Sequence, residues 1–185
     1  MNQKTRYIIG LIPLKPTIYT ETAQSLLSEM SDGYLLSSSV FPHITVAQFE
    51  LNDEEKARLQ ILWEEIAKLN IKPFNPKLIG VNFIKGLKSH DGFYWAQVAV
   101  ERDPLMMKTH HQIVDVLNKH QLSCLNDAGD IYKPHITLAR ITLSKSIPLW
   151  TSELLAAQEF RIAIGASDKD RKSTRLNSSH GYISY

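Results

Sequence analysis

Short apolar runs alternate along this chain with stretches in which apolar residues recur every three or four positions. The runs are rich in β-branched and aromatic residues and are bounded by Pro, Gly, Asn or Asp, which is typical of strands. The expected strands cover residues 7–14, a segment through 42–47 that ends near 51, 77–85, 93–101, a segment through 134–139 that ends near 143, and 159–166. Because only a short polar turn separates the strands over 77–85 and 93–101, these two are expected to form a hairpin.

The periodic stretches between the strands predict helices. The expected helices cover residues 17–31, 52–69, 103–121 and, as a short element, 150–157. Asn52 precedes three acidic residues and Asp103 precedes a proline, and both patterns are typical of helix starts. The order of elements indicates an α+β fold with a weak internal duplication, in which each half contributes a β-α-β unit.

One short phrase occurs twice, half a chain length apart and on predicted strands. Pro-His-Ile-Thr, an apolar residue and Ala occupy residues 42–47 and again 134–139. Because side chains alternate between the faces of a strand, His43 and Thr45 point the same way, with Cα atoms about 7 Å apart. His135 and Thr137 do the same, while the apolar residues between them face the core. A pseudo-twofold arrangement would bring the two strands side by side.

Two histidines and two threonines on one face have the chemistry of a phosphate site. Imidazole has a pKa near 6.5 and exchanges protons near neutrality. Displacement at phosphorus needs a base on the nucleophile and an acid on the leaving oxygen, and hydroxyls can donate hydrogen bonds to the non-bridging oxygens. We therefore predict that His43, Thr45, His135 and Thr137 are catalytic. No metal is expected, because a protonated imidazole already supplies a positive charge.

Composition bounds the kind of protein. The chain has 185 residues, of which 43% are hydrophobic, and a formal net charge of +2. This length suits a single domain of two lobes, which we place at residues 1–168. No stretch approaches the roughly 20 apolar residues of a membrane span, and the single cysteine leaves no internal disulfide, which favours a cytoplasmic location. The small charge excludes a broad nucleic-acid footprint, so any contact with nucleic acid is expected to be local.

The remaining candidates for chemistry have simpler interpretations. His110 and His111 are adjacent on a predicted helix, where neighbouring side chains diverge by about 100°, so they are not expected to share a metal. Cys124 has no paired base in the sequence pattern, and the three tryptophans are expected to pack in the core. Residues 169–185 have no apolar period, and we expect an irregular tail that is not a native structural element.

The two His-x-Thr phrases resemble the signature of the 2H phosphoesterase superfamily, which includes 2′-5′ RNA ligase-like proteins and cyclic phosphodiesterases. The resemblance covers roughly residues 5–166, and the second copy, Tyr-Lys-Pro-His-Ile-Thr-Leu-Ala-Arg over 132–140, is the better match. The first copy departs from the family in its continuation, Val-Ala-Gln-Phe-Glu over 46–50. The tail departs as well, because the family usually continues its sheet there.

The resemblance implies a bilobal α+β fold with mainly antiparallel sheets around a central cleft. It implies metal-independent chemistry, without a cofactor, on 2′,3′-cyclic phosphates or 2′-5′ phosphodiester bonds of RNA or nucleotides, as hydrolysis or reversible ligation in RNA processing. It favours His43 as the acid that protonates a departing 3′-oxygen and His135 as the base that activates water. We expect a monomer that does not associate with membranes. We expect loops 32–41 and 86–92 to determine the substrate specificity.

Two further residues are candidates for substrate binding. Arg140 lies five positions after His135, where strict alternation would place it off the His/Thr face unless a bulge intervenes. The resemblance nevertheless implies an arginine near the phosphate. Tyr132 could stack on a nucleobase, or could be a core aromatic at the rim of the cleft.

Two other classes of function use the same residues. A binding module could hold a nucleotide or an RNA end with little or no turnover, and an interaction protein could retain the motifs without using them. The intact set of two histidines and two threonines favours the enzyme, and turnover of a cyclic nucleotide separates the three.

Overall fold

The predicted strands form one antiparallel sheet in a computed structural model, which describes residues 4–143, 146, 149–167 and 174–175. The strand order is β4-β5-β6-β3-β1-β7-β8, and β2 lies beside β6. The strands are β1 Lys4–Pro13, β2 Ser31–Leu35, β3 Ile44–Asn52, β4 Leu78–Lys85, β5 Tyr94–Val100, β6 His135–Ile141, β7 Phe160–Ser167 and β8 Thr174–Arg175. The helices are α1 Thr17–Leu27, α2 Arg58–Lys68 and α3 Pro104–Lys119, with 3-10 turns η1 Asp53–Glu55, η2 Lys88–His90, η3 Gly129–Ile131 and η4 Ser152–Leu155.

The sheet consists of two halves that are joined at one point. In one half β3 pairs with β1, and β1 pairs with β7; in the other β6 pairs with β5, and β5 pairs with β4. Between the halves, β3 and β6 share the single residue pair Ile44 and Ile136. Each half is a β-α-β unit, so the expected bilobal, pseudo-twofold α+β fold is confirmed.

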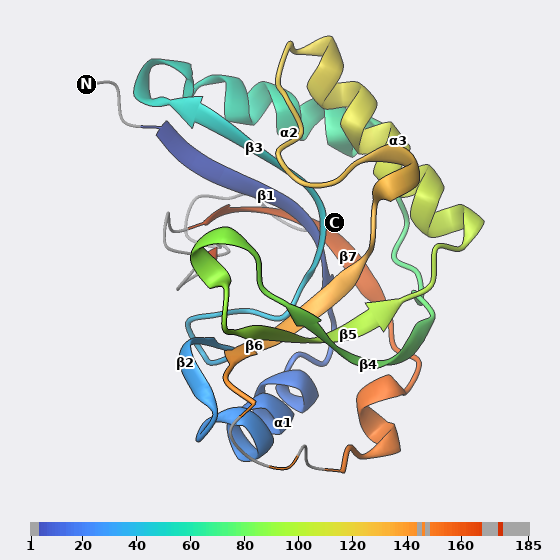
Figure 1. Cartoon of the computed structure of the whole chain (residues 1–185). Coiled ribbons are helices and arrows are strands. Elements are labelled where there is room, and N and C mark those ends of the chain that lie inside the picture. The colour runs from blue at the N-terminus through green and yellow to red at the C-terminus, as the bar shows by residue number, and fades with distance from the viewer. Residues whose placement is uncertain (1–3, 144–145, 147–148, 168–173, 176–185) are drawn as a thin grey trace.

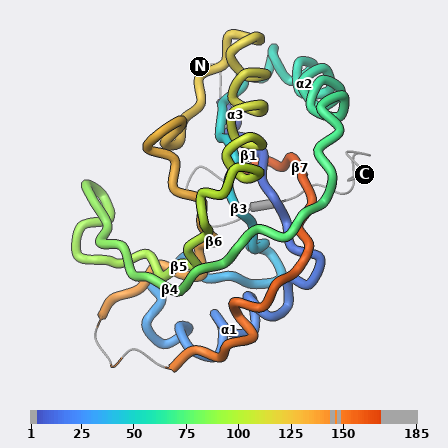
Figure 2. Tube along the Cα trace, turned by 90° about the vertical axis from the view of Figure 1, so that its right-hand side faces the viewer, coloured from blue at the N-terminus to red at the C-terminus, as the bar shows by residue number. Residues whose placement is uncertain are grey.

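Helices α1 and α3 each follow a strand of one half-sheet and pack against a strand of the other. The helix α1, which follows β1, packs against β6, and α3, which follows β5, packs against β3. In Figure 1, α2 and α3 lie above the sheet and α1 lies below it, and the turned view in Figure 2 keeps this separation. Because each half supplies the helix that covers the other half's motif strand, neither half could bury its core alone.

Alternation along the motif strands divides the core from the opposite face. Ile44, Val46, Ile136 and Leu138 are fully buried and belong to one continuous hydrophobic cluster that extends to the helices. The polar residues between them are partly exposed. The alternation in sequence therefore correctly predicted which residues of the motif strands are buried.

The expected elements are present, with differences at their ends. The hairpin and the Asp103 cap of α3 are confirmed. The first helix ends at Leu27 instead of continuing to 31, because the chain turns there into β2, which pairs with β6. In the expected tail, Thr174 and Arg175 pair with β7, and the rest of 169–185 lies outside the described residues. No helix in the described part of the chain has the length and apolarity to cross a membrane.

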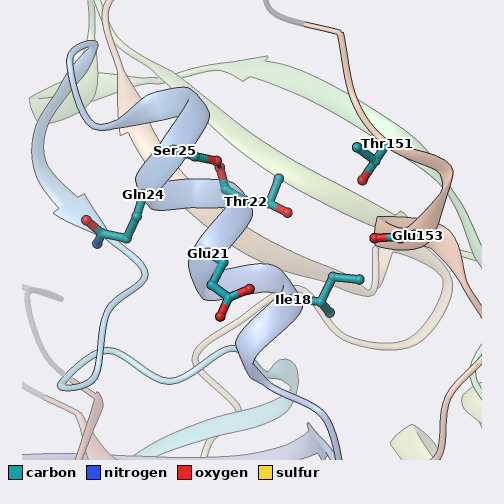
Figure 3. A pocket seen from close by; sticks show the side chains of 7 residues that line it. All are labelled: Ile18, Glu21, Thr22, Gln24, Ser25, Thr151 and Glu153. Carbon is teal, nitrogen blue, oxygen red and sulfur yellow. Dashed lines mark hydrogen bonds between the residues drawn. The ribbon is translucent and has the colours of Figure 1, made fainter.

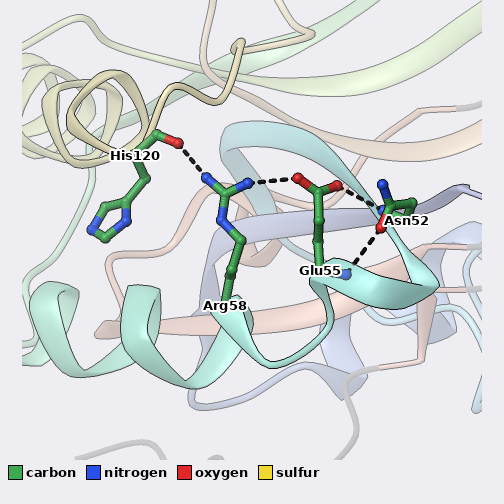
Figure 4. A network of polar contacts seen from close by, with 4 residues as sticks. All are labelled: Asn52, Glu55, Arg58 and His120. Carbon is green, nitrogen blue, oxygen red and sulfur yellow. Dashed lines mark hydrogen bonds and ion pairs between the residues drawn. The ribbon is translucent and has the colours of Figure 1, made fainter.

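A polar network fixes the junction between β3 and α2 (Figure 4). Asn52 Oδ1 accepts a hydrogen bond from the Glu55 amide at 2.9 Å, and Glu55 Oε2 accepts one from the Asn52 amide at 3.1 Å, which is a capping box. Arg58 donates to Glu55 Oε1 at 2.6 Å and to the His120 carbonyl at the end of α3. The network thus joins the start of α2 to the end of α3.

We expect Asn52→Ala to lower the free energy of unfolding by about 1 kcal/mol, because it removes the side-chain acceptor from the cap. Urea denaturation measures the change. Asn118→Ala, at an exposed position within α3, is the matched control and should leave stability unchanged or slightly higher. Equal effects of the two substitutions would contradict the role of the cap.

Candidate functional site

The four motif residues meet around the one residue pair that joins the half-sheets. His43 precedes β3 directly, and His135 is the first residue of β6. Since Ile44 pairs antiparallel with Ile136, His43 and Thr45 flank one member of this pair, and His135 and Thr137 flank the other. Successive side chains of a strand alternate between faces, so all four point away from the face of the two isoleucines. The predicted quartet of His43, Thr45, His135 and Thr137 is therefore brought together on the face away from the core.

Both imidazoles are held by the same local hydrogen bond. His43 Nδ1 lies 2.8 Å from the carbonyl oxygen of Phe41, and His135 Nδ1 lies 2.8 Å from that of Lys133. A carbonyl oxygen only accepts, so Nδ1 carries the hydrogen in both rings. Each Nε2 is then the atom left to take or give a proton.

Burial lowers the pKa of both motif histidines below the ordinary value of 6.5. The carbonyl hydrogen bond of each ring opposes this shift, and a positive charge on His135 lowers the pKa of His43 further. The two rings are therefore close enough for their charges to interact. A first proton on the pair makes a second one less favourable, which suits a site with one acid and one base.

Neither threonine hydroxyl of the quartet has a hydrogen-bond partner among the described residues. Thr45 and Thr137 are partly exposed. A hydroxyl can donate one hydrogen bond. These two groups are available to an anion placed between the histidines.

Gly10 lies against the quartet from the neighbouring strand. It pairs with Thr45, and a Cβ atom at this position would meet the Ile44 carbonyl oxygen at 3.1 Å and Cδ2 of His43 at 3.6 Å. The nearer contact is with backbone and cannot easily yield. A side chain at position 10 would therefore disturb the strand that carries His43.

A bulge in β6 brings Arg140 onto the face of the quartet. Gln97 pairs with Thr137 and Ala96 with Ala139, so Leu138 is an extra residue that shifts the alternation. The Arg140 guanidinium binds both oxygens of the Asp32 carboxylate, at 2.8 and 2.7 Å, and donates to His90 Nδ1 at 2.8 Å. It also lies 4.8 Å from the centre of the Phe93 ring. Arg140 thus joins β6 to the segments around 32 and 90; contact with substrate stays a prediction.

Tyr132 requires a correction. Its side chain is only 2% exposed, and its ring stacks on His110 with centroids 3.8 Å apart and planes 4° apart. Of the two interpretations of Tyr132, stacking on a nucleobase is wrong, because no ring face is open to a base, and the core aromatic is the one observed. The Tyr132 hydroxyl instead donates to the Thr45 carbonyl oxygen at 2.8 Å, and burial raises its pKa. It is a core residue that supports the motif strand.

His110 supports the same strand and was not predicted to do so. It is fully buried, its Nδ1 donates to the Val46 carbonyl at 2.9 Å, and its Nε2 accepts from the Gly129 amide at 3.0 Å. This pairing requires the neutral ring, and burial lowers its pKa. The signal that could have found it is helical periodicity, since position 110 shares a face with the buried Met106 and Ile113.

Two further features were candidates for a site, a metal cluster and a surface depression. Within the described ranges no three His, Cys, Asp or Glu side chains are placed to hold a metal ion. An open depression of about 630 Å³ lies over α1 (Figure 3). It is lined by Ile18, Glu21, Thr22, Gln24, Ser25, Thr151 and Glu153, none of which belongs to the quartet. The depression is therefore separate from the motif residues.

Comparison with known families and structures gives a consistent result. A family model described as the 2′-5′ RNA ligase superfamily matches residues 20–166. E. coli LigT in complex with 3′-AMP is similar in structure, with a TM-score of 0.60, 17% identity and 94% of each chain covered. A crystal structure described as a phosphoesterase has a TM-score of 0.60 at 16% identity, over 99% of this chain and 96% of that one. The MHV ns2 PDE domain has a TM-score of 0.51 at 15% identity, over 87% and 99%. At these identities the similarity shows a shared fold.

The curated relatives that match this chain are segments of much longer viral polyproteins. Replicase polyprotein 1a of Berne virus is 22% identical over 115 residues, which is 61% of this chain and 2% of the viral one. The corresponding polyprotein of Breda virus 1 is 23% identical over 115 residues. The chain therefore spans only a small part of the curated relatives it matches.

We expect His110→Phe to destabilise the protein, because it keeps a stacked ring but leaves the Val46 carbonyl and the Gly129 amide without partners. Each lost partner costs about 1–3 kcal/mol. The free energy of unfolding, measured in urea from pH 8 to pH 5, checks this. The folded-state pKa of His110 is lowered, so the contribution of this residue is complete above 6.5 and is lost as the pH falls further.

The deficit of His110→Phe should therefore be largest above pH 6.5 and shrink below it. His111→Phe, at the exposed neighbour, is the matched control and should show no comparable deficit. A deficit that is constant with pH would contradict a neutral His110 in the folded state.

Proposed function

The chain belongs to the 2′-5′ RNA ligase superfamily, and from this premise we propose that it is a metal-independent phosphoesterase acting on 2′,3′-cyclic phosphates or 2′-5′ phosphodiester bonds of nucleotides or RNA. The observation that supports the proposal is the pair of imidazoles beside the Ile44–Ile136 pair, each with Nδ1 bound to a carbonyl and Nε2 left for chemistry. E. coli LigT has been crystallised in complex with 3′-AMP, phosphate and NADP+, which supports nucleotide binding in this fold.

Hydrolysis of a cyclic phosphate would use both rings. The neutral imidazole takes a proton from water at Nε2 while the water oxygen forms a bond to phosphorus. The P–O3′ bond breaks on the opposite side, and the protonated imidazole gives its Nε2 proton to the departing 3′-oxygen. The product is a 2′-phosphate, and the two rings have exchanged protonation states. The same sequence with a 5′-hydroxyl in place of water would be ligation to a 2′-5′ bond, and its reverse would cleave that bond to a cyclic phosphate.

The threonines supply the anion contacts of the proposed site. The hydroxyls of Thr45 and Thr137 can donate to the two non-bridging oxygens, which carry most of the charge in the transition state. Because the backbone already holds both residues, these donors need little reorganisation during the reaction. We propose Arg140 as a further phosphate contact, which would require its guanidinium to leave Asp32 in part.

We expect His43→Ala and His135→Ala each to lower kcat for a 2′,3′-cyclic nucleotide by at least about 100-fold, because each removes one proton-transfer group. The assay runs in excess chelator and resolves the 2′-phosphate from the 3′-phosphate product. His111→Ala, at an exposed histidine outside the quartet, should keep full activity.

Activity that disappears in chelator and returns with a metal ion would contradict the two-histidine mechanism. A folded protein that binds nucleotide but turns over none would instead be a binding module. Thermal melts of all variants show whether each is folded.

The pH dependence of kcat/KM should be bell-shaped with its maximum below 6.5. The active form carries one proton on the pair, and both histidine pKa values are lowered from 6.5 by burial. As the pH falls the base becomes protonated, and as it rises the acid loses its proton. Initial rates at subsaturating substrate from pH 4.5 to 8.5 test this, and a maximum above 7 would oppose the proposed pair.

A further inference from the structure

The face that carries the quartet continues across the second half-sheet as a row of polar side chains. Thr137 in β6 pairs with Gln97 in β5, and Gln97 pairs with Asn82 in β4. Paired residues in an antiparallel sheet point to the same face, and neighbouring strands lie about 4.8 Å apart. The Cα atoms of Gln97 and Asn82 therefore lie about 5 Å and about 10 Å from the Cα atom of Thr137, in one row across the strands. Figure 1 shows the three strands side by side.

The amides in this row have unused hydrogen-bonding groups. The Asn82 Oδ1 atom is buried, and no described residue donates to it. The side chain of Gln97 is partly exposed and has no hydrogen bond to any residue in the described ranges. Buried polar atoms without partners are rare in folded proteins, and each calls for an explanation such as a water, an ion or a functional role. A covered, unpartnered acceptor and a partly exposed amide thus lie side by side on the face of the quartet, and a ligand would reach the acceptor once the Asn82 side chain turned outward.

The corresponding row on the other side of the quartet lacks such groups. There Thr45 pairs with Gly10, and Gly10 pairs with Ala163. These two positions correspond to Gln97 and Asn82 in the pseudo-twofold arrangement, but they carry no polar side chain. Of these four positions, only the two on β5 and β4 are therefore polar; on the other half-sheet the nearest comparable group is Arg161 in β7, whose Nε atom is also buried without a partner among the described residues.

We propose that Gln97 and Asn82 bind the nucleobase of the substrate and determine its base preference, with the nucleoside lying over β5 and β4. This inference rests on the proposed function, which places the phosphate between the two histidines. A primary amide offers a donor beside an acceptor, and this pair matches the N6 and N7 edge of adenine. The amino group of adenine also supplies the donor that Asn82 Oδ1 lacks. The expected preference is for an adenine nucleotide over a uracil nucleotide.

Binding of nucleotide products tests the proposal without requiring turnover. The probes are 2′-AMP, 2′-UMP and inorganic phosphate, titrated by calorimetry into the unmodified protein, Gln97→Met and Asn82→Leu. Both substitutions keep the approximate size of the side chain and remove its hydrogen bonds. Each should weaken 2′-AMP about tenfold, bring its affinity close to that of 2′-UMP, and leave phosphate unchanged. Gln60→Met, on the exposed surface of α2, is the matched control.

The outcomes separate this inference from the proposed function. Equal weakening of 2′-AMP and phosphate, or no change in the ratio of 2′-AMP to 2′-UMP, would overturn the base site while leaving the phosphate site in place. Discrimination that the substitutions abolish, in a protein that turns over no cyclic nucleotide, would support the base site and reject the enzyme. If neither nucleotide binds the unmodified protein, the base site is rejected. Gln97→Glu, which keeps an acceptor and loses the donor, provides a second variant should Gln97→Met fail to fold.

Discussion

The pairing of Ile44 with Ile136 is the constraint on which the rest of the molecule depends. It is the one residue pair that β3 and β6 share, and the two half-sheets diverge on either side of it. Both side chains are fully buried, so the residues on either side of them must face the opposite way. One hydrophobic contact in the core therefore fixes the register of two histidines and two threonines that are far apart in sequence.

The edge of β3 that faces β6 is paired at only one residue, so the rest of that edge needs other hydrogen-bond partners. Beyond Ile44, the carbonyls of Thr45 and Val46 are taken by Tyr132 and His110, which stack on each other. These two side chains come from the segment before β6 and from α3, so the second half of the chain supports the motif strand of the first. The support requires a neutral histidine in the interior, and the position of Thr45 is thereby linked to the packing of α3.

The sequence predicted the parts of this structure that periodicity controls. Alternation placed the quartet on one face, and a proline after Asp103 marked the start of α3. Burial at a loop is not visible in the pattern, so the sequence leaves base stacking and a core position both open for Tyr132, and the structure places it in the core. The extra residue at Leu138 in β6 depends on how β5 pairs with it, which no local signal reports, and for this reason the face of Arg140 was left open. The interaction of His110 depends on tertiary contacts of the same kind.

The two half-sheets are related by a pseudo-twofold axis, but the residues beside the quartet differ between them. The two imidazoles have equivalent backbone contacts, so in the proposed mechanism their roles as acid and base would depend on where the substrate lies. In-line displacement puts the leaving oxygen on the nucleoside side of phosphorus and water on the other. A nucleoside over Gln97 and Asn82 would place that oxygen on the side of β6, the strand that carries His135, and water on the side of β3. The family resemblance favours His43 as the acid, whereas the polar row favours His135. The side on which the base binds would therefore also decide the direction of proton transfer.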